Sequence, residues 1–236
     1  MVCGPARYLV FFQYFGTRYS GVMETKSDQA LVGVQNYLEE AAQKLKPSAP
    51  IKFHISSRTD TGVHALANAA HVDIQRAPGK APFTAQQLVQ GLNYHLRPEP
   101  IRILSAQRVP GTFHARFCAL SRTYVYRLLL GCAHHSQIPV FERDLCWAPA
   151  GGELEFWEVK VKGKAFLYKQ VRRMVGALVA VGQGKFSPQR IQELLELKDS
   201  RAFPPHSMAP ASGLFLQSVE YSQEDLAPPG AEEELS

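Results

Sequence analysis

The pattern of apolar and polar positions divides the first half of the chain into alternating strands and helices. Helical spacing of apolar residues predicts a helix over residues 29–46, and Thr84 with Gln87 forms a capping box that begins a second helix. Apolar and polar residues alternate, as in half-buried strands, at residues 7–14, 51–55, 70–74 and 101–109. The predicted order is β-α-β-β-α-β, which is typical of a ferredoxin-like unit.

The second half begins in the same way but lacks two elements. The pattern predicts strands and helices, in chain order, at residues 123–130, 154–161, 167–181, 188–197 and 214–221. A helix and a strand are missing between residues 130 and 154. We therefore expect an α+β fold of two ferredoxin-like halves, which form a mainly antiparallel sheet with helices on one face, the second half being incomplete.

Three regions follow from these elements and from the distribution of charge. Residues 1–110 form the N-terminal half, residues 111–222 form the shortened C-terminal half, and residues 223–236 form an acidic tail that we expect to be disordered. The tail holds five acids and no Lys or Arg, so residues 1–222 carry 26 basic against 16 acidic side chains, a net charge of +10. This basic body favours a polyanionic partner, nucleic acid before membrane.

Composition and motifs also bear on other classes of protein. No apolar run among the 236 residues approaches the roughly 20 that a membrane-spanning helix needs. The four cysteines contain no C-x-x-C pair and the N-terminus shows no signal-peptide pattern, so we expect an intracellular protein without structural zinc. Mitochondrial and cytoplasmic locations both stay open. With no P-loop, no G-x-G-x-x-G segment and no ligand spacing among the histidines, we expect no cofactor and no metal.

Residues 56–65 are the first candidate for chemistry. They connect two predicted strands and contain Thr-Asp-Thr-Gly, so a simple turn is one interpretation. The other rests on Arg58 and Asp60, which lie two positions apart at a strand end. An aspartate there can act as a nucleophile or a general base if a nearby cation keeps it ionised.

A second candidate combines cations with aromatic rings. Residues 156–176 contain six Lys or Arg residues and a single acid, with Phe166 and Tyr168 among them. Arg172 and Arg173 lie on the predicted helix of this segment. Such a mixture suits an RNA-binding surface, although a solvated helix face is the ordinary alternative.

A third candidate is the pair Tyr124 and Tyr126, which share one face of a predicted strand. One ring could stack on a nucleobase while the other packs below it. Ordinary packing within the sheet is the alternative interpretation.

Taken in order along the chain, these segments resemble the TruA family of tRNA pseudouridine synthases, and most nearly its animal tRNA pseudouridine synthase-like branch. The motifs Tyr-x-Gly-x-x-Tyr-x-Gly, Arg-Thr-Asp-x-Gly-Val-His-Ala, Phe-His-Ala-Arg-Phe and Arg-x-Tyr-x-Tyr have counterparts at residues 14–21, 58–65, 113–117 and 122–126. Three further motifs have counterparts at residues 91–98, 166–176 and 209–216. A single motif is weak, but seven in register are specific.

The resemblance implies both an activity and its residues. Asp60 takes the place of the catalytic aspartate, and Tyr124 that of the tyrosine that stacks on the target base. Arg172 takes the place of the basic partner of the aspartate, and Arg58 is expected beside Asp60 as a second substrate-binding cation. The implied enzyme isomerises uridine to pseudouridine in tRNA, without metal or cofactor, after the target nucleotide is flipped out.

The chain departs from the family between Trp147 and Phe156. The family has a helix, a Gly-x-His-Asp-Phe loop and a strand there, which are the elements that the pattern lacks. A shortened form of an active enzyme and a non-catalytic RNA-binding relative are both compatible with this gap. Ser57, where bacterial members usually have Gly, is a smaller departure.

Overall fold

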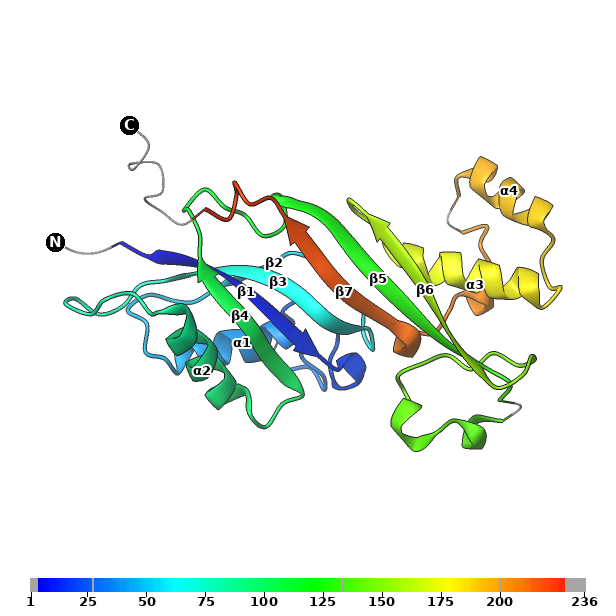
Figure 1. The fold of residues 1–236 in the computed structure, drawn as a ribbon, viewed down its shortest axis with the longest axis horizontal. Helices are drawn as coiled ribbons and strands as arrows, with labels where there is room; N and C mark the ends of the chain where they lie inside the picture. The colour runs from blue at the N-terminus through cyan, green and yellow to red at the C-terminus, as the bar shows by residue number, and fades with distance from the viewer. Residues whose placement is uncertain (1–3, 27, 133, 200, 228–236) are drawn as a thin grey trace. The chain divides into compact units, whose positions relative to one another are not determined.

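The computed structural model describes residues 4–26, 28–132, 134–199 and 201–227, and Figure 1 shows their fold. The α-helices within these ranges are α1 (Val34–Gln43), α2 (Ala85–Leu96), α3 (Gln170–Gly182) and α4 (Pro188–Leu197). The strands are β1 (Ala6–Tyr14), β2 (Phe53–Ile55), β3 (His64–Ile74), β4 (Ile101–Arg108), β5 (Ala119–Leu130), β6 (Glu155–Gly163) and β7 (Leu214–Tyr221). Residues 228–236, most of the predicted acidic tail, lie outside the described residues.

The strands form one open sheet. Their hydrogen-bonded order is β4-β1-β3-β7-β5-β6, and β2 pairs with β3 outside this path. The pairs β1–β3, β1–β4 and β2–β3 are antiparallel. The prediction of an α+β fold with a mainly antiparallel sheet is therefore confirmed.

The chain divides into two compact units. The first contains the described residues up to Thr123 and those from Leu216 onward. In this unit α1 packs on β2 and α2 packs on β4, and both helices bury their apolar stripes, which include Leu38, Leu88 and Leu92. The capping box of α2 forms as predicted: the Thr84 hydroxyl accepts a hydrogen bond from the Gln87 N–H (3.2 Å), and the Gln87 side chain accepts one from the Thr84 N–H (3.0 Å).

The predicted helix over residues 29–46 is too long at both ends. The Asn36 Oδ1 accepts a hydrogen bond from the Gly33 N–H (3.1 Å), which caps the helix there. A Cβ at Gly33 would lie 1.7 Å from the carbonyl oxygen of Met23, so this residue is pressed against the preceding loop. At the other end Lys46 adopts a φ of +56°, which turns the chain out of the helix.

Strand β3 is longer than the predicted segment of residues 70–74, because it already begins at His64. Its first half is rich in alanine and lacks a clear alternation of apolar and polar residues. Pairing with β1 extends through Ala65, which lies opposite Tyr14, so the neighbouring strand rather than the local pattern sets the length of β3.

The second unit runs from Tyr124 to Phe215, and some of its helices and strands bury no residue. Helix α3 buries Val171 and Val175, whereas neither α4 nor β6 has a buried residue. Between β5 and β6, the described residues hold two short 3-10 helices and no α-helix or strand. No helix in the described part of the chain has both the length and the apolar character needed to cross a membrane.

Candidate active site

The loop of residues 56–63, called the Asp60 loop here, connects β2 to β3. Arg58 is exposed, Thr59 is buried and Asp60 is half-buried. Gly62 adopts a φ of +80°, and the Val63 N–H donates a hydrogen bond to the Asp60 carbonyl oxygen (3.1 Å). The loop therefore ends in a tight turn, as its Thr-Asp-Thr-Gly sequence predicted.

The loop that follows β1 packs onto the backbone of the Asp60 loop. The Tyr14 hydroxyl lies 2.7 Å from Thr59 Oγ1, and the Val22 N–H donates to the Thr59 carbonyl oxygen (3.2 Å). A Cβ at Gly21 would lie 2.6 Å from that oxygen, and the φ of Gly21, +112°, also favours glycine. The first predicted motif thus serves to hold the backbone around Asp60.

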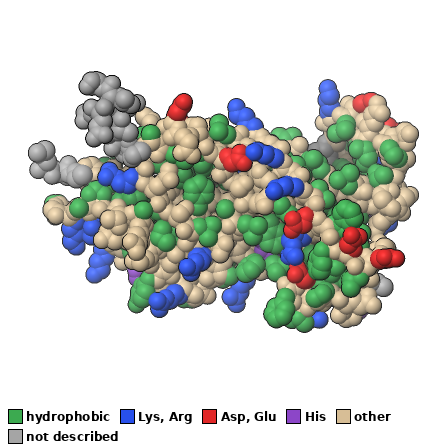
Figure 2. Space-filling model, in the orientation of Figure 1, with side chains coloured by type: hydrophobic (Ala, Val, Ile, Leu, Met, Phe, Trp, Pro, Cys, Tyr) green, Lys and Arg blue, Asp and Glu red, His purple; other side chains and the backbone are tan. Residues whose placement is uncertain are grey.

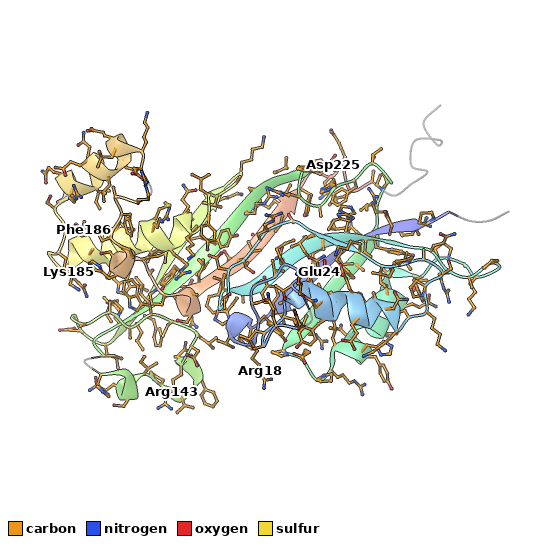
Figure 3. The ribbon with its side chains drawn as sticks, turned by 180° about the vertical axis from the view of Figure 1, so that it is seen from behind. Arg18, Glu24, Arg143, Lys185, Phe186 and Asp225 are labelled. Atoms are coloured by element: carbon orange, nitrogen blue, oxygen red, sulfur yellow. The ribbon has the colours of Figure 1, made fainter. Side chains whose placement is uncertain are left out.

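A second glycine of the same loop makes a similar approach. The Gly16 N–H donates a hydrogen bond to His64 Nδ1 (3.0 Å). A Cβ on Gly16 would lie 2.0 Å from the carbonyl oxygen of Val63. Gly16 begins the short 3-10 helix η1 (Gly16–Arg18), whose last residue, Arg18, is labelled in Figure 3. Two glycines therefore press against the backbone of the Asp60 loop on either side of Asp60, at Thr59 and at Val63.

Tyr124 and Tyr126 both lie on β5 but have different surroundings. Tyr126 is fully buried, and its hydroxyl donates a hydrogen bond to the Pro210 carbonyl oxygen (2.7 Å). Burial also raises the pKa of Tyr126. Tyr124 is 8% exposed and meets the ring of Phe166 edge to face, with ring centroids 5.3 Å apart. Tyr126 therefore serves the packing of the second unit, and Tyr124 remains the candidate for contact with a base.

Arg172 is fixed by reciprocal bonds to one residue. Its Nε donates a hydrogen bond to the Ala209 carbonyl oxygen (2.8 Å), and the Ala209 N–H donates to the Arg172 carbonyl oxygen (3.1 Å). A Cβ at Gly176, one turn further along α3, would lie 2.0 Å from the Ser207 carbonyl oxygen. The motifs at residues 166–176 and 209–216 are thus packed against each other, which orients the Arg172 side chain.

The remaining cations of the predicted RNA-binding segment lie on and around β6 and α3. Lys160, Lys162 and Lys164 are exposed. The Lys169 ammonium lies 4.7 Å from the centroid of the exposed Tyr168 ring. On the face shown in Figure 2, Lys and Arg side chains are dispersed among hydrophobic and neutral ones, so this face has no single basic patch.

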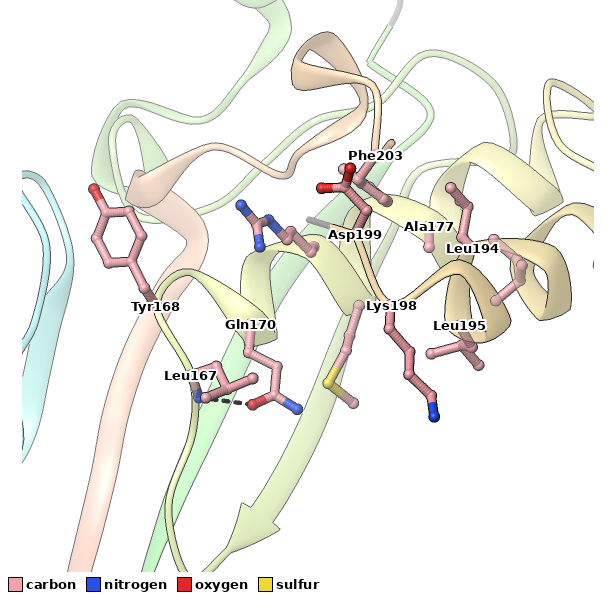
Figure 4. A pocket seen from close by; sticks show the side chains of 12 residues that line it. Leu167, Tyr168, Gln170, Ala177, Leu194, Leu195, Lys198, Asp199 and Phe203 are labelled. Atoms are coloured by element: carbon pink, nitrogen blue, oxygen red, sulfur yellow. Dashed lines mark hydrogen bonds between the residues drawn. The ribbon is translucent and has the colours of Figure 1, made fainter. Parts of the chain in front are cut away.

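A cavity of about 310 Å³ lies between α3 and the segment that follows it (Figure 4). Its lining is mostly apolar and includes Leu167, Met174, Leu194, Leu195 and Phe203, together with Tyr168, Arg173 and Lys198. The Leu167 N–H donates to Gln170 Oε1 (2.8 Å), which fixes the turn into α3 at the edge of this cavity.

Three histidines that are far apart in the sequence lie together in the first unit. One ring nitrogen from each of His54, His71 and His114 lies within 4.8 Å of the other two. The rings of His54 and His71 stack with centroids 4.5 Å apart. The sequence pattern, which showed no ligand spacing, did not reveal this cluster, because β2, β3 and the turn before β5 bring its members together.

The hydrogen bonds of this cluster oppose the binding of a metal ion. The Ala115 N–H donates to His71 Nδ1 (3.1 Å), and the Arg116 N–H donates to His114 Nδ1 (3.2 Å). Burial lowers the pKa of both imidazoles, that of His71 to about 3, so both are neutral with their proton on Nε2. A metal ion at Nε2 would require the other tautomer and the loss of both bonds.

The predicted site residues are distributed over both units. Arg58 and Asp60 lie on one loop of the first unit, whereas Tyr124 and Arg172 belong to the second. Sequence reasoning gave no role to Arg122, which is buried with its guanidinium among main-chain and serine oxygens of the first unit. The available signal was a charged residue inside a strand that is mostly apolar.

Comparison with known proteins finds similarity along most of the chain. The sequence model of a family described as tRNA pseudouridine synthase matches residues 10–118 and 134–222. A "tRNA pseudouridine synthase-like 1" of Xenopus laevis is 49% identical over 290 aligned positions, which cover 99% of this chain and 97% of the relative. The human protein of the same name is 42% identical over 273 positions, covering 92% of this chain and 90% of its own.

Bacterial proteins match over a similar extent. A "tRNA pseudouridine synthase A" of Paramagnetospirillum magneticum is 33% identical over 261 positions, which cover 92% of this chain and 95% of the relative. The family match includes the Asp60 loop within residues 10–118 and Arg172, on α3, within residues 134–222. The chain therefore belongs to the tRNA pseudouridine synthase family, of the TruA type.

Proposed function

We propose that this chain isomerises uridine to pseudouridine in tRNA and that Asp60 is its catalytic residue. The observation that carries the proposal is the motif at residues 58–65, which presents Asp60 on a loop whose backbone is contacted on both sides of Asp60 by glycines of the preceding motif. The family match and the names of the relatives support the reaction and the substrate.

The reaction rearranges the atoms of the nucleotide without adding any. The N1–C1′ bond of uridine breaks, the base turns, and a C5–C1′ bond forms. The hydrogen on C5 leaves as a proton, and N1 gains one from water. A carboxylate can attack the base or the sugar, or accept the C5 proton, and we assign this part to Asp60.

The other site residues have supporting roles in this proposal. Arg58, which is exposed beside Asp60, would contact the tRNA backbone, where a cation can hold a distorted strand. Tyr124 would stack on the flipped base. Arg172 would be the basic partner that keeps the Asp60 carboxylate ionised.

Replacement of Asp60 by Asn tests the catalytic role. The variant keeps the size of the side chain but removes the carboxylate, so release of tritium from C5-labelled tRNA should fall to background, with tRNA binding retained. Asp28→Asn, the same change at an exposed position, is the matched control and should retain full activity. Measurable turnover by Asp60→Asn would show that another group does the chemistry.

The alternative is an RNA-binding relative without chemistry, in which the basic residues persist but no isomerisation occurs. The same assay distinguishes the two. If the wild-type chain releases no tritium from any cellular tRNA, yet binds tRNA as tightly as Asp60→Asn does, the binding function is correct and the catalytic proposal is wrong.

We further propose that the chain consists of two ferredoxin-like halves, of which the second lacks a helix and a strand. The alignment to the Xenopus laevis relative has 290 positions, whereas this chain has 236 residues, so at least 54 of those positions are gaps in this chain. Phe156 and Trp157, on β6, are 50% and 53% exposed. Aromatic side chains on a strand are normally covered by a neighbouring element. The exposure of these two therefore supports a missing neighbour beside β6.

A further inference from the structure

Arg122 is a buried cation that is almost completely surrounded by oxygen atoms. It lies on β5 and is 9% exposed. One terminal nitrogen donates to the carbonyl oxygen of Arg116 (2.8 Å), and the other lies 3.5 Å from the carbonyl oxygen of Ala119. A buried charge is costly unless its donors are satisfied, so these oxygens and the guanidinium hold one another in place.

The same guanidinium holds the start of the Asp60 loop. Its Nε donates to Ser57 Oγ (3.3 Å), and a terminal nitrogen donates to both the carbonyl oxygen and Oγ of Ser56 (3.3 Å each). The planar fork of arginine can make these bonds in several directions at once, which the single ammonium of lysine cannot. Arg122 therefore fixes the chain three and four residues before Asp60.

Arg122 thus acts as a clamp between the Asp60 loop and the turn before β5, and this turn is itself held in place. The turn before β5 is anchored by hydrogen bonds from the Arg7 guanidinium to the carbonyl oxygen of Phe113 (2.8 Å) and from the Tyr221 hydroxyl to that of Ala115 (2.7 Å). The N–H of Ala115 is held by His71. Because Arg122 binds the next carbonyl, that of Arg116, it connects a fixed turn to the Asp60 loop.

We propose that Arg122 is a positioning residue for catalysis, which sets the place of Asp60 through Ser56 and Ser57 and does not itself touch the substrate. The inference rests on the proposed function, in which Asp60 is catalytic. Small displacements of a reacting group cost more in rate than in substrate binding when most of the contacts with the substrate, here all but that of Arg58, lie on other segments. Loss of the clamp should therefore lower kcat and leave KM for tRNA nearly unchanged.

Two variants of different severity test this role. Arg122→Lys keeps the charge but loses the fork, so kcat should fall about 10- to 100-fold with KM within about twofold of wild type. Ser57→Ala removes one acceptor and leaves Arg122 intact, and it should lower kcat less. Ser121→Ala, which loses a bond to Glu220 outside the Asp60 loop, is the control and should leave kcat unchanged.

The double variant Arg122→Lys/Ser57→Ala shows whether the two substitutions lower kcat through the same hydrogen bond or independently of each other. If Arg122 acts through Ser57, the double variant loses less kcat than the product of the two single losses. Multiplicative losses, or a kcat of Arg122→Lys equal to wild type, would overturn the proposal.

Hydrogen exchange gives a readout that does not depend on activity. In Arg122→Lys the amides of residues 56–63 should exchange at least several-fold faster, while those of α2 keep the wild-type rate. If wild type proves inactive, the proposed function fails, but the positioning role still stands or falls by this local exchange. Unchanged exchange in the Asp60 loop, or faster exchange throughout the first unit, would overturn it.

Discussion

At the scale of single residues, the proposed stacking of Tyr124 on the target base can be tested by changing one side chain of β5 at a time. Tyr124→Phe keeps the ring that stacks on a base, so turnover should stay close to wild type. Tyr124→Ala removes the ring, and because stacking on an aromatic is worth about 1–3 kcal/mol per base, turnover should fall by about 10- to 100-fold. Tritium release from labelled tRNA measures both variants.

Tyr126→Phe is the matched control for Tyr124. It removes the buried hydrogen bond to Pro210, which should lower the free energy of unfolding by about 1 kcal/mol. Turnover per folded molecule should not change. If Tyr124→Phe and Tyr124→Ala lose activity equally, the hydroxyl of Tyr124 rather than its ring face is what the reaction uses.

The lowered pKa of His71 predicts how the free energy of unfolding depends on pH. Its pKa is about 3 in the folded chain, against an ordinary value near 6.5, because of burial and of the nearby His54, Arg7 and His114. The unfolded chain therefore takes up a proton below pH 6.5 that the folded chain does not. This contribution to stability is complete above pH 6.5 and is lost as the pH falls, by up to about 1.4 kcal/mol for each pH unit.

Urea unfolding at pH 7, 6 and 5 measures this slope. Over this range the carboxyl of Asp73, paired with Arg7, stays ionised, since that pair lowers its pKa. His71→Asn offers an oxygen to the Ala115 N–H but does not titrate, so its stability should fall less between pH 7 and 5. The same slope in both proteins would contradict the assignment to His71.

At the scale of elements, α3 depends on how closely its backbone approaches a neighbouring segment. Alanine in place of a glycine inside a helix normally stabilises by about 0.5–1 kcal/mol. At Gly176 the opposite is expected, because the new Cβ would lie 2.0 Å from the Ser207 carbonyl oxygen, and both sides of that contact are backbone. Gly176→Ala should therefore lower the melting temperature and displace Arg172 from Ala209.

Gly182→Ala is the control on the same helix. A Cβ there would meet nothing within 4 Å, so the variant should be neutral or slightly stabilising. Differential scanning fluorimetry measures the melting temperatures of the two variants and so tests whether the close contact at Gly176 makes the difference. Equal melting temperatures would show that the chain around Ser207 can move away without cost.

At the scale of the whole molecule, the second unit exposes more apolar surface than a stable sheet usually leaves uncovered. Leu154, Phe156 and Trp157 are all at least half exposed on or beside β6. Large exposed apolar side chains along a strand favour association between chains. We therefore expect this form to be weakly active and prone to aggregate.

Insertion of the helix, loop and strand of the family between Trp147 and Phe156 tests this expectation. The longer form should melt at a higher temperature and release tritium from C5-labelled tRNA faster than the 236-residue form. An insert of equal length made of Gly and Ser is the control, since it lengthens the chain without supplying an apolar face. If the short form melts as high and turns over as fast, the segment is dispensable.

The sequence by itself determined the approximate positions of most helices and strands and the motifs that hold the candidate site residues. Alternation predicted β1 and β7, and the Thr84 capping box predicted the start of α2, because these signals are local and act within a few residues. The motif at residues 58–65 identified the Asp60 loop and its turn, since Thr-Asp-Thr-Gly specifies that turn directly. Family membership followed from the order of seven such motifs.

Tertiary structure alone decided the features that depend on distant partners. The start of α1 is set by contact between Gly33 and Met23, and β3 extends back to His64 because β1 lies beside it. The histidine cluster and the contacts of Arg122 join residues that are up to 66 positions apart. A periodic pattern records which face of an element is apolar, but it holds no information about which other element will meet that face.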